Sequence, residues 1–175
     1  MADNRSYWFR FLLGLQSLDL VTGGIRAALL RATGATIDRT AFMEAGVKVV
    51  AGRLSIGADS YVNRNCLFDA RGGIAIGNNV LVGPRVTILT ATHPVMPGLP
   101  RAGPVEYEPV MIGANAWIGA AVTLLPGAVV GPGCVIAAGA VVRGKLEADT
   151  LYAGVPAQSK RKLGLPPAGD HLATG

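Results

Sequence analysis

The sequence predicts an all-β protein in which short strands stack as a parallel β-helix. The first observation is a run of aliphatic residues at every sixth position: Ile112, Ile118, Leu124, Val130, Ile136 and Val142. This period fits neither an α-helix nor a simple strand, and it is typical of a solenoid. The second observation is a glycine after many of these residues, as in Ile56-Gly57 and Ile118-Gly119. We expect such glycines to let the backbone bend between flat faces without the steric cost of a Cβ.

Length and composition agree with this fold. The 175 residues suffice for one domain with a continuous core, and 50% of them are hydrophobic, 15% are charged and 24 are glycine. The net charge of +5 favours anionic small molecules, but the basic residues are scattered apart from residues 160–162, which argues against a nucleic-acid partner. No signal peptide or apolar membrane-spanning stretch stands out, so we expect a cytoplasmic protein.

Residues 1–34 do not follow the period of six and predict an N-terminal helical cap that ends near Gly34. A stacked-repeat fold needs a cap over its exposed end. Segment 7–15 is more apolar than a cap requires, because only Arg10 and Gly14 interrupt it. It can cap the solenoid, contact a neighbouring subunit or make a peripheral contact with a membrane, and the sequence leaves all three open.

Residues 35–162 are predicted to form the β-helix, with a two-residue slip at Gly72-Gly73 that resets the series. Residues 93–109 are rich in proline and glycine and cannot pair as solenoid strands, so we expect them to leave the coil as an external loop. Function concentrates on long loops that a rigid scaffold holds. Residues 163–175 are predicted to be a flexible tail.

Cys66 and Cys134 each fall four residues after an aliphatic anchor, where other coils carry alanine or valine. A position shared by these residue types is a small slot that faces the interior. We therefore expect both thiols to be buried packing groups rather than disulfide, metal or catalytic residues.

The chain has two histidines, and they lie in different predicted segments. His171 lies in the tail, whereas His93 lies where the coil gives way to the loop and precedes Pro94, which restricts its backbone. An imidazole titrates near neutral pH and can take a proton from an attacking hydroxyl. A zinc site on this fold would need about three converging histidines, so no metal is predicted. Neither a phosphate-binding P-loop nor a GxSxG nucleophile motif occurs.

Several segments resemble the hexapeptide-repeat O-acetyltransferases of the maltose, galactoside and nodulation-factor group. They are Thr90-Ala-Thr-His-Pro94, Glu106-Tyr107, Pro109-Val-Met-Ile-Gly113, Asn115-Ala-Trp-Ile-Gly119, Leu125-Pro-Gly127, Ala138-Gly-Ala-Val-Val142 and Ala153-Gly-Val-Pro-Ala157. The match covers roughly residues 55–162, whereas the hydrophobic N-terminus resembles the members that acetylate exopolysaccharide building blocks. The resemblance implies a left-handed coil, which the period alone does not give. It also implies a homotrimer with active sites between protomers, and acetyl transfer from acetyl-CoA to a saccharide hydroxyl.

The resemblance also implies roles for individual residues. His93 would be the general base, Asn63 would hold the acceptor hydroxyl or the oxyanion, and Glu106 would orient the imidazole. Trp117 would form a wall of the substrate pocket, and Tyr107 would line the same loop. Two of these residues have an alternative, since Asn63 can simply close a turn and Trp117 can pack between subunits.

For acetyl-CoA, the resemblance places the pantetheine arm along the backbones of Ala120 and Ala138. It assigns the phosphates to Arg143, Lys160 and Arg161. The sequence departs from the relatives here. Their Thr-Lys pair is replaced by Arg143-Gly-Lys145, and Gln158 stands where they have an arginine. Residues 160–162 can also be a solvated basic segment.

Two other functions stay open from the sequence. One is acetylation of an antibiotic or amino-sugar nitrogen, on the same scaffold. The other is a catalytically silent trimeric scaffold, which the apolar segment 7–15 favours.

Overall fold

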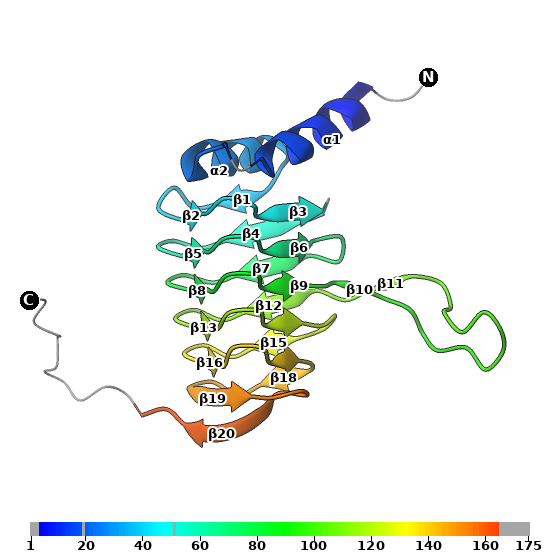
Figure 1. The fold of residues 1–175 in the computed structure, drawn as a ribbon, viewed down its shortest axis with the longest axis vertical. Coiled ribbons are helices and arrows are strands. Elements are labelled where there is room, and N and C mark those ends of the chain that lie inside the picture. Colours follow the sequence, from blue (N-terminus) through cyan, green and yellow to red (C-terminus); the bar gives the residue numbers. More distant parts are fainter. Residues whose placement is uncertain (1–3, 19, 51, 165–175) are drawn as a thin grey trace, which may run out of the picture.

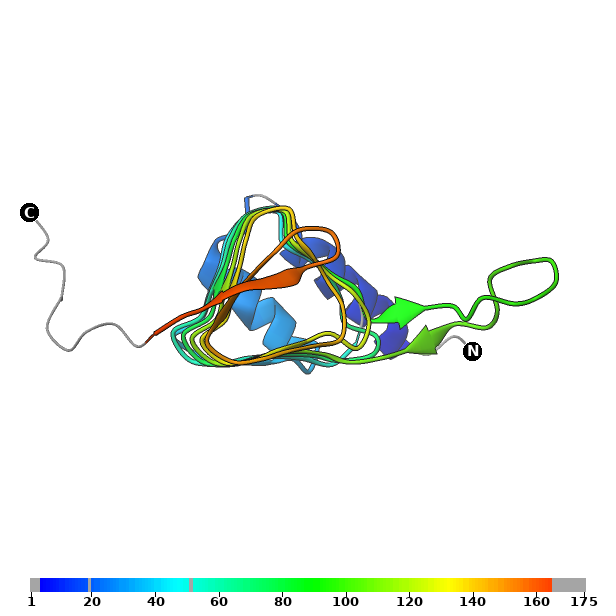
Figure 2. The same cartoon turned by 90° about the horizontal axis from the view of Figure 1, so that it is seen from below.

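The computed structural model describes residues 4–18, 20–50 and 52–164, and it consists of two helices followed by a stack of short strands (Figure 1). The helices are α1 (Asn4–Gln16) and α2 (Gly23–Ala32). Three parallel arrays of strands follow, which we call sheets A, B and C. Viewed along the stack, they enclose a triangular prism (Figure 2).

Each sheet stacks parallel strands from successive coils, and in sheet B the last strand, β20, pairs antiparallel with β19. Sheet A contains β1 (Thr36–Ile37), β4 (Leu54–Ile56), β7 (Ile74–Ile76), β12 (Val110–Ile112), β15 (Val129–Val130) and β18 (Lys145–Leu146). Sheet B contains β2 (Phe42–Met43), β5 (Tyr61–Val62), β8 (Leu81–Val82), β13 (Trp117–Ile118), β16 (Val135–Ile136), β19 (Thr150–Ala153) and β20 (Gln158–Lys162). Sheet C contains β3 (Lys48–Val50), β6 (Leu67–Asp69), β9 (Thr87–Ile88), β14 (Thr123–Leu124) and β17 (Val141–Val142).

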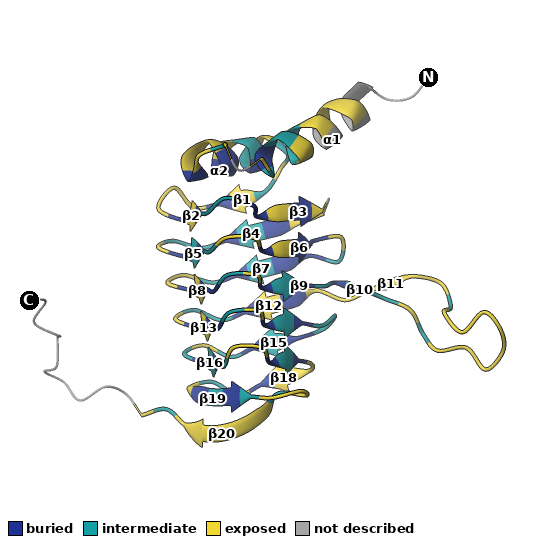
Figure 3. Ribbon diagram, in the orientation of Figure 1, coloured by how far each residue is buried: buried dark blue, intermediate teal, exposed yellow. Residues whose placement is uncertain are grey.

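The register explains the period of six. Ile112 of sheet A pairs with Val130, the residue three sixfold steps later, and Ile118 of sheet B pairs with Ile136 in the same way. Three steps therefore complete one coil, and every anchor points into the prism. All six residues of the initial run are buried. Figure 3 colours the strands of the stack by burial. The prediction of a parallel β-helix with a short helical part is confirmed.

The small-residue slot is also buried, as predicted. Each of its members lies one position before a strand, and both cysteines belong to it. Its members are Cys66, Val80, Val86, Ala116, Val122, Ala128, Cys134 and Ala140.

The glycines after the anchors have a different physical reason from the one we expected. Gly113 and Gly119 are absent from the residues with positive φ, so conformational freedom is not what they supply. A Cβ on Gly113 would lie 2.5 Å from the backbone nitrogen of Pro132 in the next coil. These positions are glycine because neighbouring coils approach too closely for a side chain.

The two helices cover the first coil. Helix α2 packs against β1 and β2, and α1 packs against α2. The guanidinium of Arg26, which is fully buried, donates hydrogen bonds to the carbonyls of Gln16 (2.7 Å), Leu18 (2.8 Å) and Met43 (3.5 Å). One buried side chain therefore joins α1, the link to α2 and the first coil. No helix in the described part of the chain has the length and apolar character needed to cross a membrane.

The division into a cap (1–34), a β-helix (35–162) and a tail (163–175) stays a prediction. Residues 165–175, including His171, lie outside the described residues.

Candidate functional site

The external loop leaves the prism at the edge between sheets C and A, because it connects β9 of sheet C to β12 of sheet A. Its root is a short antiparallel hairpin of β10 (Ala91–Thr92) and β11 (Glu106–Tyr107). An isolated bridge between Val95 and Ala102 continues the pairing outward. The loop then projects away from the stack (Figure 1).

His93 follows β10 directly and is exposed. Its Nδ1 lies 2.7 Å from the carbonyl oxygen of Gly103 on the opposite limb of the loop. A carbonyl can only accept, so this contact fixes the tautomer with the proton on Nδ1. Nε2 is then the basic nitrogen, available for a substrate proton. The orienting group in the single chain is thus a backbone carbonyl, which no side-chain motif could reveal, and the role of Glu106 stays a prediction.

Glu106 and Tyr107 lie on the returning strand of the same loop, and both are exposed. Glu106 pairs with Thr92, the residue before His93. The Tyr107 ring lies under the guanidinium of Arg71, with 5.6 Å between the carbon and the ring centroid.

Asn63 lies at another edge of the prism, in the turn between β5 of sheet B and β6 of sheet C. Its Oδ1 accepts a hydrogen bond from the backbone nitrogen of the next residue, Arg64, at 2.8 Å. Its Nδ2 has no hydrogen-bond partner within the described residues and can still donate to a ligand.

Trp117 lies on the outer face of sheet B, where it is 53% exposed. It belongs to a column of apolar residues that we call the sheet B stripe, consisting of Phe42, Tyr61, Leu81 and Trp117. The rings of Phe42 and Tyr61 are stacked, with centroids 5.9 Å apart and an interplanar angle of 7°. Apolar side chains in continuous exposed array mark a contact surface.

The single chain therefore does not bring all the predicted site residues together. His93, Glu106 and Tyr107 share the loop at the C–A edge, whereas Asn63 lies at the B–C edge and Trp117 on the face of sheet B. The loop points away from its own prism instead of folding back over it (Figure 2).

Of the residues predicted for the cofactor, Ala120 and Ala138 lie in successive coils at the same B–C edge as Asn63. The Gly139 backbone nitrogen donates to the Ala120 carbonyl at 2.8 Å. Arg143 follows β17 at the C–A edge, and Lys160 and Arg161 lie on the terminal strand β20. All three cations are exposed.

Both thiols are unsuited to nucleophilic attack. Burial raises the pKa of Cys66 to about 11, and its Sγ donates to the carbonyls of Asn63 (3.2 Å) and Gly83 (3.3 Å). Burial also raises the pKa of Cys134. Thiols of this kind are almost entirely protonated at neutral pH. Within the described ranges, no three His, Cys, Asp or Glu side chains are grouped to hold a metal ion.

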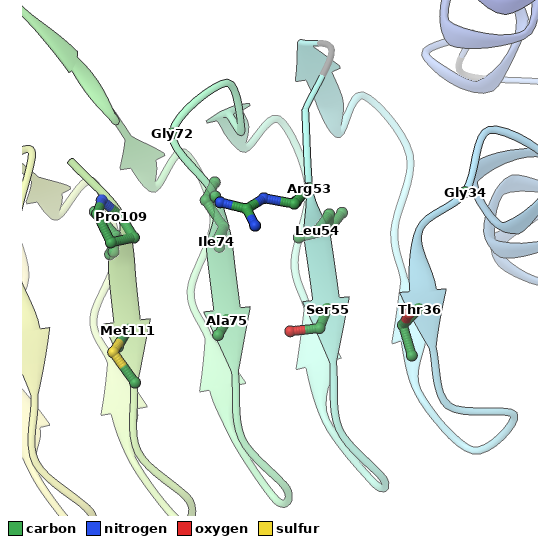
Figure 4. A pocket seen from close by; sticks show the side chains of 12 residues that line it. Gly34, Thr36, Arg53, Leu54, Ser55, Gly72, Ile74, Ala75, Pro109 and Met111 are labelled. Carbon is green, nitrogen blue, oxygen red and sulfur yellow. The ribbon is translucent and has the colours of Figure 1, made fainter. Parts of the chain in front are cut away.

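A shallow hollow of about 430 Å³ lies on the outer face of sheet A (Figure 4). Arg53 extends along one side of it, and Ser55, Ala75 and Met111 form its floor. None of the predicted site residues line it.

Comparison with known proteins decides the family. Residues 109–144 match the model of the bacterial transferase hexapeptide (six repeats). The galactoside O-acetyltransferase of Escherichia coli (strain K12) is 34% identical over 139 residues, which are 79% of this chain and 68% of that protein. The chain belongs to the hexapeptide-repeat O-acetyltransferase family. The chain spans about half of the length of three other curated relatives, two putative acetyltransferases from Schizosaccharomyces pombe and Saccharomyces cerevisiae and the galactoside O-acetyltransferase of Lactococcus lactis, at 52% to 55%.

Solved structures agree with this assignment. A maltose O-acetyltransferase from Clostridium difficile 630 superposes with a TM-score of 0.70 and 28% identity, covering 91% of this chain and 86% of the other. A hexapeptide-repeat acetyltransferase of Vibrio cholerae O1 biovar eltor, complexed with acetyl coenzyme A, superposes with a TM-score of 0.70 and 26% identity, covering 93% and 91%. The family member described here thus shares nearly its whole fold with both.

Proposed function

We propose that this protein transfers an acetyl group from acetyl-CoA to a saccharide hydroxyl, at a site between adjacent protomers of a homotrimer. Relatives that act on galactosides and maltose, and a neighbour solved with acetyl-CoA, support the reaction class. The observation that carries the proposal is the His93 imidazole, held through Nδ1 on a loop that extends beyond its own prism, with Nε2 left basic.

The chemistry follows from these groups. Nε2 of His93 removes the hydroxyl proton as the acceptor oxygen attacks the thioester carbonyl. The new C–O bond forms a tetrahedral oxyanion, which Asn63 Nδ2 of the neighbouring protomer can stabilise as a donor. The C–S bond then breaks, and CoA leaves as a thiolate that takes the proton from His93. No acyl-enzyme forms, in keeping with the high thiol pKa values.

The trimer accounts for the separation of His93 and Asn63 within one chain. Cyclic assembly presents the loop of each protomer to a different edge of the next, so three identical contacts would complete three sites. The sheet B stripe, which carries Trp117 and Leu81, offers the apolar surface that such a contact needs. Trp117 would then lie between the two protomers beside the acceptor.

The B–C edge would hold the pantetheine arm. Ala120 and Ala138 are small and stacked, so a narrow chain can lie against their backbones. Arg143, Lys160 and Arg161 would approach the phosphates from the two protomers that form the groove, as cations suited to phosphate oxygens.

We also propose that segment 7–15 makes a surface contact, with a neighbouring subunit or peripherally with the inner face of the membrane. Tyr7, Trp8 and Phe11 are all more than half exposed. The rings of Tyr7 and Trp8 have one polar end and suit a lipid–water boundary, and the Phe11 ring suits its apolar side. This would place a cytoplasmic enzyme beside a lipid-linked saccharide. Co-flotation with liposomes, lost in a Trp8→Ser/Phe11→Ser variant, tests the membrane contact.

The central experiment measures CoA release from acetyl-CoA with a galactoside, an amino sugar and a streptogramin antibiotic as acceptors. The proposal predicts turnover with the saccharide hydroxyl, lowered ~10²–10⁴-fold by His93→Ala and unchanged by His171→Ala. A rate that His93→Ala leaves intact contradicts the mechanism. Faster turnover of an amine or antibiotic identifies the alternative acceptor. A silent scaffold would show no rise in Tm with CoA, because only a ligand of the native state stabilises it.

A further inference from the structure

The loop that carries His93 stands on a short turn of the preceding coil, residues 69–73. Asp69 ends β6 inside the prism wall, and its carboxylate accepts two hydrogen bonds from the Arg71 side chain, from Nε at 2.8 Å and from Nη2 at 2.7 Å. The Asp69 side chain is only 9% exposed, whereas that of Arg71 is 46% exposed. The fork of the guanidinium is therefore fixed at one end and open at the other.

Both limbs of the loop are attached to this turn through Thr90. Its buried hydroxyl donates to the Asp69 carbonyl at 2.6 Å and accepts from the Gly72 nitrogen at 2.8 Å. Its carbonyl accepts from the Glu108 nitrogen at 2.9 Å. A Cβ on Gly72 would lie 2.9 Å from Thr90 Cβ and 3.1 Å from the Glu108 oxygen. The turn and the loop root are thus in direct contact, with no room for a side chain between them.

The open end of Arg71 reaches the loop itself. Its guanidinium lies over the Tyr107 ring, 5.6 Å from the centroid, a cation–π contact. Tyr107 pairs with Ala91 across the hairpin, and His93 is two residues further along the strand of Ala91. A planar cation that is held by a buried carboxylate thus contacts the ring of a residue in the hairpin.

We infer that Arg71, fixed by Asp69, is a positioning residue that sets the direction in which the loop leaves the prism and thereby the placement of the His93 imidazole. It acts through Tyr107 and the hairpin. The catalytic consequence rests on the proposed function, whereas the consequence for loop order does not.

The first test measures loop order without any turnover. Hydrogen–deuterium exchange is followed at the amides of residues 91–107 in Arg71→Ala, Arg71→Lys and Tyr107→Leu proteins. Tyr107→Leu keeps the Arg71–Asp69 pair, so it reports on the stacking contact even if Arg71→Ala folds poorly. Exchange in the hairpin should rise roughly two- to fivefold, the loss expected of a partly exposed cation–π contact. Arg71→Lys should recover part of the protection. The control Arg39→Ala removes another exposed arginine and should change nothing there. Unchanged hairpin exchange in both Arg71→Ala and Tyr107→Leu overturns the inference.

The second test asks whether Arg71 acts through His93. With a galactoside acceptor, Arg71→Ala should lower kcat by ~10–10²-fold, the cost of a displacement near 1 Å, with KM for acetyl-CoA unchanged. In a His93→Ala background the same substitution should cost almost nothing further, because coupled residues are not additive. Additive losses overturn the positioning role. If the wild type shows no turnover, the proposed function fails and hydrogen exchange alone decides the inference.

Discussion

Replacing Arg26 with methionine tests how the helices are held on the coil. The two short hydrogen bonds from Arg26, at 2.7 and 2.8 Å, satisfy carbonyls of the α1 terminus and the link that follows it. Methionine fills similar volume but cannot donate. The Leu18 carbonyl keeps the Val21 backbone N–H as a donor at 3.1 Å, whereas the carbonyl of the buried Gln16 is left unpaired. One unpaired buried carbonyl should cost about 1–3 kcal/mol of cap stability.

Arg31→Met is the matched control. Arg31 also lies on α2 and also donates to two carbonyls, those of Ile37 (2.8 Å) and Asp38 (2.7 Å). Its side chain is only half-buried, so water can replace the lost donor. We expect a loss below about 1 kcal/mol, since the desolvation penalty is small at a wetted site.

The assay is native-state hydrogen exchange with increasing urea, read separately for α1–α2 and for sheet B. Coils in a solenoid contact only their neighbours, so Arg26→Met should open the helices while the distant coils stay protected. Equal losses for Arg26→Met and Arg31→Met, or a loss near zero for both, would refute the burial argument.

Three further outcomes follow from the geometry. Gly113→Ala should lower Tm strongly, because its Cβ would lie 2.5 Å from the Pro132 nitrogen, whereas Gly98→Ala, with nothing within 4 Å, should leave Tm unchanged by calorimetry. Native Cys66 should react with iodoacetamide at pH 8 far more slowly than in urea, since burial raises its pKa to about 11; equal rates would show an exposed thiol. Hydrogen bonding from Arg71 lowers the Asp69 pKa below its unfolded value, so its contribution is full above about pH 4 and is lost as pH falls further. Asp69→Asn should therefore be less stable at neutral pH and lose less on acidification, and an unchanged acid profile of the unfolding midpoint would contradict this.

The fold was predictable because its signal repeats. Residues such as Ile118 and Ile136 occupy equivalent positions in successive coils. The same pattern of inward-facing aliphatic residues therefore recurs in every coil and can be recognised in the sequence. The reason for the glycines was less accessible. Close approach of Gly113 to the next coil depends on the spacing of coils, which a linear sequence does not display.

Single, non-repeating contacts escaped prediction. Arg26 lies among small and apolar residues of α2. No sequence pattern in that segment indicates that its guanidinium is buried against the carbonyls of Gln16 and Leu18. Arg71 and Tyr107 are far apart in sequence. They are in contact because the loop ends in β11, which pairs with β10 next to the turn that contains Arg71. Neither contact has a local pattern.

The candidate site was predictable in part. The scarcity of histidine singled out His93, and the structure places it at the loop exit as expected. Its hydrogen-bond partner is the backbone carbonyl of Gly103. Every residue has such a carbonyl, so the sequence could not indicate which one binds His93. His93 lies in a segment that joins sheet C to sheet A, whereas Asn63 lies in a turn that joins sheet B to sheet C. Their separation therefore depends on the assignment of strands to sheets, which requires the three-dimensional structure.

Mixing two inactive variants tests most directly whether His93 of one protomer works with Asn63 of the next. His93→Ala and Asn63→Ala proteins are unfolded together in equal amounts and refolded. In randomly assembled cyclic trimers, about a quarter of the interfaces would pair an intact His93 with an intact Asn63. The account predicts that about this fraction of wild-type CoA release returns. Activity no greater than the average of the two separate variants would contradict it, because a site within one chain cannot be restored by mixing.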